Sequence, residues 1–127
     1  MSALIEHSLQ LYADKYGDPY ASAYPKLYAL DSDYQGLFVL DTDEGLRRNM
    51  MRTTLEIIAT YLDDPTAAAN RIIGARVSHA TYGIEDSFDQ FFEITRDVIA
   101  ESLAEAFTPD HARAWQVMLE DFEKAQI

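Results

Sequence analysis

Residues 46–62, LRRNMMRTTLEIIATYL, carry the pattern that decides the fold class. Their apolar side chains recur at the spacing that places them on one face of an α-helix. These side chains are Leu46, Met50, Met51, Leu55, Ile57, Ile58, Tyr61 and Leu62. Asp41, followed by Glu44, resembles a capping box just before this stretch. The pattern therefore predicts one long helix that begins after Asp41.

Helix boundaries on either side are marked by proline and glycine. The pairs Asp18-Pro19, Asp64-Pro65 and Thr108-Pro109 each place a capping acceptor before a proline, whose missing N–H costs nothing in a first turn. Five other helices are predicted. The first ends at Gly17, and the second starts at Pro19 and is kinked at Pro25. The remaining three run from Pro65 to His79 with closure at Gly83, from Ser87 to Phe107, and from Pro109 onward. Only one short helical turn is expected between Leu30 and Asp41. Because no segment alternates with period two between hairpin signals, we predict an all-α fold.

The apolar stripes of the last two helices predict which side chains are buried. On the helix from Ser87 these are Phe88, Phe91, Phe92, Val98, Ile99 and Leu103, and on the last helix they are Ala112, Trp115, Leu119 and Phe122.

Length and composition restrict the kind of protein. The chain has 127 residues, 48% of them hydrophobic, which fits a single domain over 1–127 with a sizeable core. Its 22 acidic and 10 basic residues give a net charge of -12, which repels nucleic acid and anionic membranes. The absence of cysteine excludes disulfides and thiolate metal sites. No basic region precedes an apolar core at the N-terminus, so we expect a cytoplasmic protein.

Histidine is the residue type with the most specific chemistry here, and the chain has three. His7 has polar neighbours and His111 lies in the first turn of the last predicted helix, so we expect both at the surface. None of the three is spaced from a second ligand as zinc or di-iron sites require. His79 differs because it lies near the end of an apolar-faced helix, where a histidine is either a core or capping residue or a ligand.

The context of His79 resembles a known family. The string His79-Ala80-Thr81-Tyr82-Gly83-Ile84, then a long helix, then Phe107-Thr108-Pro109 with Ala114-Trp115, is similar to the second half of a globin. Tyr24 and Phe38, fourteen residues apart, match the separation of two distal residues in single-domain bacterial haemoglobins and the globin domain of flavohaemoglobins. The resemblance spans nearly the whole chain and implies a globin-like helical fold. It places a haem pocket between a distal and a proximal helix, with a shortened last helix.

The resemblance also implies roles for individual residues. His79 would be the proximal ligand of haem b (iron protoporphyrin), because haem iron takes a neutral imidazole that is fixed by its other N–H. Tyr82 would belong to the turn after it, and Phe92 corresponds to the family's proximal tyrosine. Tyr24 would donate a hydrogen bond to bound dioxygen, and Phe38 would pack flat on the porphyrin.

The distal helix and the charges around the haem are less determined by the pattern. One register places Arg47 over the gas with Met51 one turn on, and the other places Leu46 and Met50 there; we prefer Arg47 with Met51. Half of the basic residues lie between positions 47 and 76, in the two helices around the expected haem: Arg47, Arg48, Arg52, Arg71 and Arg76. Of these, Arg76 is the natural partner for a haem propionate, because it lies one turn before His79.

Three functions are compatible with a globin of this kind. The first is reversible binding of dioxygen or another diatomic gas. The second is an enzyme, either a nitric oxide dioxygenase or peroxidase-like; Phe92 lacks the hydroxyl of the family's proximal tyrosine, and such an enzyme would need a separate reductase. The third is a haem-based gas sensor or regulatory module. The last two helices are a candidate surface for a homodimer.

Overall fold

The computed structural model describes residues 2–80 and 85–126. Within these ranges every regular element is helical, which confirms the all-α prediction. The elements are α1 (Ser2–Tyr16), α2 (Tyr20–Leu30), α3 (Asp33–Gly36), α4 (Gly45–Asp63), α5 (Pro65–Ala80), α6 (Glu85–Leu103), the 3-10 turn η1 (Ala104–Ala106) and α7 (Pro109–Lys124). In this part of the chain no helix is long and apolar enough to span a membrane.

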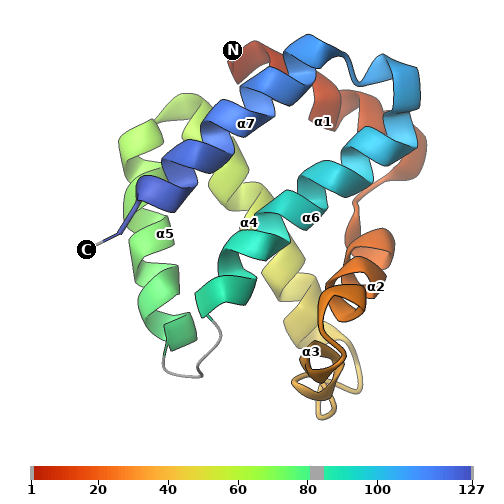
Figure 1. Ribbon diagram of the computed structural model, residues 1–127, viewed down its shortest axis with the longest axis vertical. Coiled ribbons are helices and arrows are strands. Elements are labelled where there is room, and N and C mark those ends of the chain that lie inside the picture. The colour runs from red at the N-terminus through yellow and green to blue at the C-terminus, as the bar shows by residue number, and fades with distance from the viewer. Residues whose placement is uncertain (1, 81–84, 127) are drawn as a thin grey trace.

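Two central helices hold the fold together. Figure 1 shows α6 crossing in front of α4, with α5 to one side and α2 and α3 to the other. The helix α4 packs against α5, α6 packs against α2, and α1 packs against both α6 and α7. Figure 1 also shows α3 near the lower end of α4, with α2 above it on the same side.

The predicted helix starts are confirmed at three of the four marked positions. The Asp18 carboxylate accepts from the N–H of Tyr20 at 2.8 Å, and that of Asp64 accepts from Thr66 and Ala67. The Thr108 hydroxyl accepts from the N–H of His111. These acceptors satisfy N–H groups that a helix leaves unpaired in its first turn.

The predicted capping box of Asp41 and Glu44 is wrong. Glu44 has a left-handed backbone (φ 62°) immediately before α4, and its carboxylate accepts from the Tyr20 hydroxyl at 2.7 Å. It therefore cannot reach back to the preceding turn. Asp41 and Asp43 cap the helix instead. The two carboxylate oxygens of Asp41 accept from the N–H groups of Leu46 and Arg47, each at 2.9 Å, and the Asp43 carboxylate accepts from the N–H of Gly45 at 3.0 Å.

The apolar stripe of α6 is confirmed for Phe88, Phe91, Phe92, Val98 and Ile99, while Leu103 is only partly buried. The stripe of α7 needs one correction. Trp115, Leu119 and Phe122 are buried, and the indole N–H of Trp115 donates to the Ser8 hydroxyl of α1 at 2.8 Å. Ala112, however, is exposed. The buried face of α7 is offset from the predicted one and includes His111, Ala114 and Met118.

The surface placement predicted for His111 is wrong, while that for His7 is confirmed. His111 is only 3% exposed. Its Nδ1 accepts from the backbone N–H of Thr108 at 2.9 Å, so the ring proton must lie on Nε2, which is 2.9 Å from Nδ1 of His7. The sequence contains the signal for the Thr108 contact, because a side chain three residues after the cap can close a capping box.

We expect the stability of the protein to fall as the pH drops below about 6.5, the unfolded pKa of histidine. Burial, and then the neighbouring His7, lower the pKa of His111 below its ordinary value, against a smaller opposing effect of Asp110. The unfolded chain therefore takes up a proton that folded His111 excludes, and the stability present above the unfolded pKa is lost as the pH falls toward the folded one. His111→Gln keeps a cap acceptor and cannot titrate. Urea unfolding at several pH values should show a smaller loss of unfolding free energy at low pH for this variant than for the unaltered protein. Equal losses in both proteins would exclude His111 as the cause.

Candidate functional site

A mainly apolar cavity of about 280 Å³ lies between α4, α5 and α6 and is also lined by residues of α2, of α3 and of the segment after α3. Its lining side chains are Leu27, Tyr34, Leu37, Phe38, Asn49, Met50, Thr53, Thr54, Ile57, Ala75, Ser78, His79, Phe88, Phe91 and Phe92. Asn49, Ser78 and Leu37 are also exposed to solvent, so the cavity is open on the side where they lie. Small-molecule sites have this character: apolar walls with few polar groups.

His79, in the last turn of α5, is the histidine in this wall, and an imidazole is a common metal ligand. Its Nδ1 lies 2.7 Å from the backbone carbonyl oxygen of Ala75, one turn earlier. A carbonyl can only accept, so Nδ1 carries a proton, and in the neutral ring the lone pair is therefore on Nε2. The ring also contacts Phe88, with centroids 5.1 Å apart. The hydrogen bond and the ring contact together fix both the tautomer and the orientation of the imidazole.

The side of the cavity formed by α6 is aromatic. The helical spacing of Phe88, Phe91 and Phe92 brings all three into the wall. Phe88 and Phe92 meet edge to face with centroids 5.3 Å apart. Such edge-to-face packing holds ring positions more tightly than aliphatic contacts do. The result is a water-excluding wall next to His79.

The side formed by α4 carries the polar groups. Asn49 and Thr53, and likewise Met50 and Thr54, are four residues apart and so lie on one face. The Thr54 hydroxyl donates to the Met50 carbonyl at 2.9 Å, which uses its proton. The Asn49 side-chain oxygen accepts from Arg52, which leaves the amide N–H groups of Asn49 as donors. Asn49 and Thr53 are therefore the side chains of α4 that can donate into the cavity.

The residues predicted for the site fall into three groups. Phe38, His79 and Phe92 line the cavity together. Tyr24, Arg47, Met51 and Arg76 are not among its lining residues. Tyr82 lies outside the described residues.

The register of α4 combines features of both alternatives. Met50 lines the cavity. Met51 is buried and borders a second, open cleft that Tyr20 and Arg48 also line. Leu46 is exposed. Leu46 and Arg47 are thus both outside the wall, and the helix meets the cavity from Asn49 onward.

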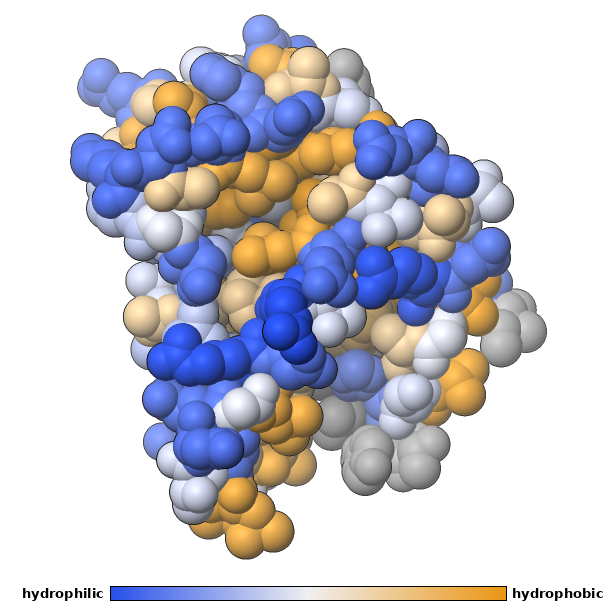
Figure 2. Space-filling model, turned by 180° about the vertical axis from the view of Figure 1, so that it is seen from behind, coloured by the Kyte–Doolittle hydropathy of each residue, from blue (hydrophilic) through white to orange (hydrophobic). Residues whose placement is uncertain are grey.

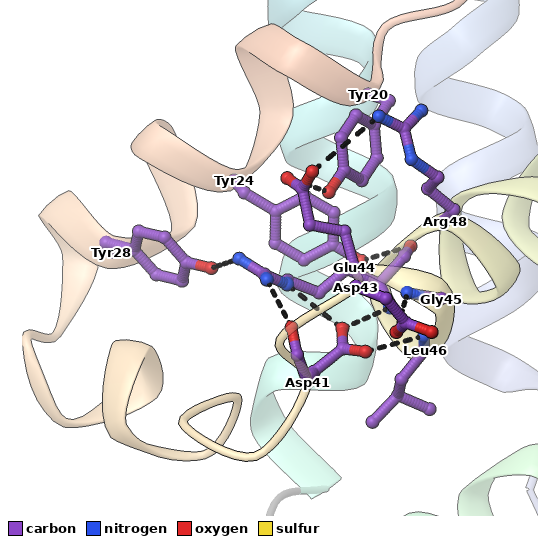
Figure 3. Close-up of polar contacts among 10 residues, drawn as sticks. Tyr20, Tyr24, Tyr28, Asp41, Asp43, Glu44, Gly45, Leu46 and Arg48 are labelled. Carbon is purple, nitrogen blue, oxygen red and sulfur yellow. Dashed lines mark hydrogen bonds and ion pairs between the residues drawn. The ribbon is translucent and has the colours of Figure 1, made fainter.

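Arg47 and Tyr24 belong to a polar cluster that anchors the start of α4. Figure 3 shows Tyr24, Tyr28 and Asp41 of this cluster around the first turn of the helix. The Arg47 guanidinium donates to the side chain of Asp41 at 3.0 Å and to its backbone carbonyl at 2.8 Å, and it approaches the Tyr28 hydroxyl at 3.4 Å. The Tyr24 hydroxyl donates to the backbone carbonyl of Arg47 at 2.8 Å. Burial alone would raise the pKa of the Asp41 carboxyl, but the N–H groups of Leu46 and Arg47 and the guanidinium hold it below its usual range.

Tyr24 is also part of the aromatic support behind the cavity. Its ring lies 5.6 Å from that of Phe38 and 5.2 Å from that of Phe91, and both of these rings line the cavity. Burial, more than the neighbouring Tyr20 and Tyr28, raises the pKa of the Tyr24 hydroxyl well above its ordinary value. The hydroxyl therefore stays protonated and keeps donating to the Arg47 carbonyl.

Arg76 ties three helices together at the end of α7. Its guanidinium makes a bidentate pair with Asp89 of α6, at 2.7 and 2.8 Å. It also donates to the backbone carbonyls of Phe122 and Ala125, at 2.7 and 2.9 Å. These carbonyls belong to the last turn and C-cap of α7, where a helix has no partners of its own. The donors of Arg76 are thereby engaged within the protein.

Four of the five arginines of the expected cluster are paired with carboxylates of the protein. Arg47, Arg48, Arg71 and Arg76 pair with Asp41, Glu44, Glu56 and Asp89 respectively. Among the described residues no lysine or arginine lines the cavity. A negatively charged group at the opening would meet Asn49 and Ser78, with Arg52 behind Asn49.

The part of the chain that the structure describes contains no cluster of three or more His, Asp or Glu side chains that could enclose a metal ion. An axial ligand to a metal already held in a macrocycle requires only one side chain. Comparison with family models, curated proteins and solved structures gives no match to this chain. The geometry of the cavity is therefore the basis for a functional proposal.

Proposed function

We propose that the chain is a haem-binding globin that reversibly binds dioxygen or another diatomic gas. The observation that supports this most is the position of His79. Its ring is held by the Ala75 carbonyl through Nδ1 and by Phe88 in the wall of an apolar cavity, which leaves Nε2 as the nitrogen available to a metal. A neutral imidazole held in this way is the usual protein ligand of haem iron.

Two features of the cavity bear on whether a haem fits: its apolar walls and its solvent-exposed opening. A flat apolar macrocycle needs aromatic and aliphatic walls, which Phe38, Ile57, Phe91 and Phe92 supply. A tetrapyrrole is larger than the cavity of about 280 Å³, so its polar edge would have to stand in the solvent-exposed opening. That opening carries neutral polar side chains, which is compatible with propionates that remain largely hydrated.

Bound haem would supply the iron centre at which a diatomic gas binds. The protein's own side chains would bind the iron, keep bulk water away, and offer hydrogen-bond donors to the bound gas. His79 would perform the first task, and the aromatic side chains of α6 would contribute to the second. For the third, the donors are Asn49 and Thr53 rather than Tyr24, because the Tyr24 hydroxyl is bound to the Arg47 carbonyl.

If Asn49 and Thr53 are the donors, their substitution should affect bound dioxygen more than substitution of Tyr24, which is the donor that the resemblance to globins implies. Asn49→Ala and Thr53→Val should each increase the rate of dioxygen dissociation from haem-loaded protein by about three- to tenfold, which corresponds to the loss of one hydrogen bond. Tyr24→Phe should change it less than about twofold. Stopped-flow displacement of dioxygen by carbon monoxide measures all three rates. A large acceleration in Tyr24→Phe alone would return the donor role to Tyr24.

Whether the protein is a gas carrier or an enzyme can be decided by measuring catalytic turnover of nitric oxide. Nitric oxide is added to the oxygenated protein in the presence of a chemical reductant, and nitrate is measured. A gas-binding protein should consume about one equivalent rapidly, after which nitrate should form only as slowly as the chemical reductant returns the oxidised haem to the ferrous state. Continued consumption at a steady rate would instead support a nitric oxide dioxygenase that works with a separate reductase.

A further inference from the structure

The turn between α3 and α4 exposes apolar side chains to an unusual degree. Val39 is 74% exposed and Leu40 is 91% exposed. Leu37 and Leu46, on either side of them, are about half exposed. We call these four residues the turn patch. In Figure 2 the lower end of the molecule, where this turn lies, shows apolar surface next to hydrophilic surface.

This exposure is concentrated rather than scattered. Eight large apolar side chains are exposed in the described part of the chain, and five of them lie between positions 30 and 46. Isolated exposed leucines need no explanation, but a contiguous group at one end of a molecule marks an interaction surface. The turn is held in a defined shape, since the N–H groups of Leu37, Val39 and Asp41 each bond to a carbonyl three residues earlier.

Carboxylates surround the turn patch. Residues 31–44 contain five acidic side chains and no lysine or arginine. Asp41 and Glu44 pair with arginines of α4, whereas no cation within the described residues pairs with Asp31, Asp33 or Asp43. The patch is therefore an apolar centre with an uncompensated negative rim.

This charge decides between three possible occupants. A second copy of the chain would bring the same negative rim and an overall charge of -12 against itself. An anionic lipid surface would be repelled in the same way. A protein whose docking face has an apolar centre ringed by lysine and arginine would be attracted by the rim and would cover the exposed side chains.

We propose that the turn patch is the docking surface for such a basic protein. Its position gives the contact a consequence, because Leu37 belongs both to the patch and to the wall of the cavity. A partner bound there would stand at the opening of the site. Docking itself does not depend on haem, so it is tested separately from the proposed function.

The test uses cytochrome c, a small basic protein, as the probe, with the full chain and isothermal titration calorimetry. The triple variant Asp31→Asn, Asp33→Asn, Asp43→Asn removes the rim charge and keeps side-chain oxygens at positions 31 and 43, which accept from the backbone N–H groups of Asp33 and Gly45. Its control, Glu6→Gln, Glu105→Gln, Glu120→Gln, removes the same charge from exposed positions on α1, η1 and α7. Binding should weaken at least about fivefold in the rim variant and less than about twofold in the control.

A second pair of variants tests the apolar centre. Val39→Ser with Leu40→Ser should weaken the complex at least about fivefold, whereas Val117→Ser on α7 should leave it unchanged. The proposal is overturned if the rim variant and its charge-matched control weaken binding equally, or if the serine variant binds like the unaltered chain. It is also overturned if sedimentation shows a dimer that the serine variant abolishes, or if vesicles rich in phosphatidylserine bind the chain through this turn.

Discussion

Replacing His79 with glycine is expected to weaken haem binding at least about hundredfold. Loss of an outer partner that only orients a metal ligand already costs 10- to 100-fold in affinity, and here the ligand itself is removed. The apolar walls remain, so the variant should still hold haem weakly. Titration of the apoprotein with haem, followed by absorption, measures the change.

Two controls make the His79 result specific. Added imidazole should restore much of the spectrum of the unaltered protein, because the vacated space next to Phe88 lies in the cavity wall. His7→Ala, on the exposed face of α1, should bind haem like the unaltered chain. Equal affinities of His79→Gly and the unaltered chain would mean that haem, if bound, is held by some other residue.

The second large effect is expected at Arg76. Its guanidinium is 15% exposed and neutralises Asp89 while it binds two carbonyls at the end of α7. Breaking a fully buried ion pair costs 3–5 kcal/mol, and this pair is partly solvated, so we expect Arg76→Leu to lower the free energy of unfolding by about 2–3 kcal/mol. Urea denaturation monitored by circular dichroism gives this value.

The control for Arg76 is an exposed arginine of the same chain whose ion pair contributes little to stability. Arg113 pairs with Asp110 on the exposed surface of α7, and Arg113→Ala should cost less than about 0.5 kcal/mol. Haem-loaded Arg76→Leu should keep the absorption spectrum of the unaltered protein, since its donors point to α6 and α7. A variant that is as stable as the unaltered chain but loses haem would instead support the propionate role predicted from the sequence.

The helices could be predicted from the sequence because their determinants are local. Asp64 and Thr108 cap the helices that follow them through hydrogen bonds to residues two or three positions away. The capping box at Asp41 failed because Glu44 binds Tyr20, a residue of another helix. Periodicity says nothing about such a distant partner.

The site was predicted only in part for a similar reason. His79, Phe38 and Phe92 were identified by resemblance and share one cavity. The arginines were assigned to a cofactor, but their partners are carboxylates and carbonyls up to 49 residues away, which a linear pattern cannot show. In α4, Met50 and Met51 are both apolar, and only the packing of α4 against α5 and α6 determines that Met50 meets the cavity.

The most direct test of haem binding through His79 is resonance Raman spectroscopy of the unaltered chain, loaded with haem and reduced. We predict saturable uptake of about one haem per chain, with an iron–histidine stretching band that disappears in His79→Gly. A chain that takes up no haem, or a stretching band that persists in the glycine variant, would contradict the proposed role of His79.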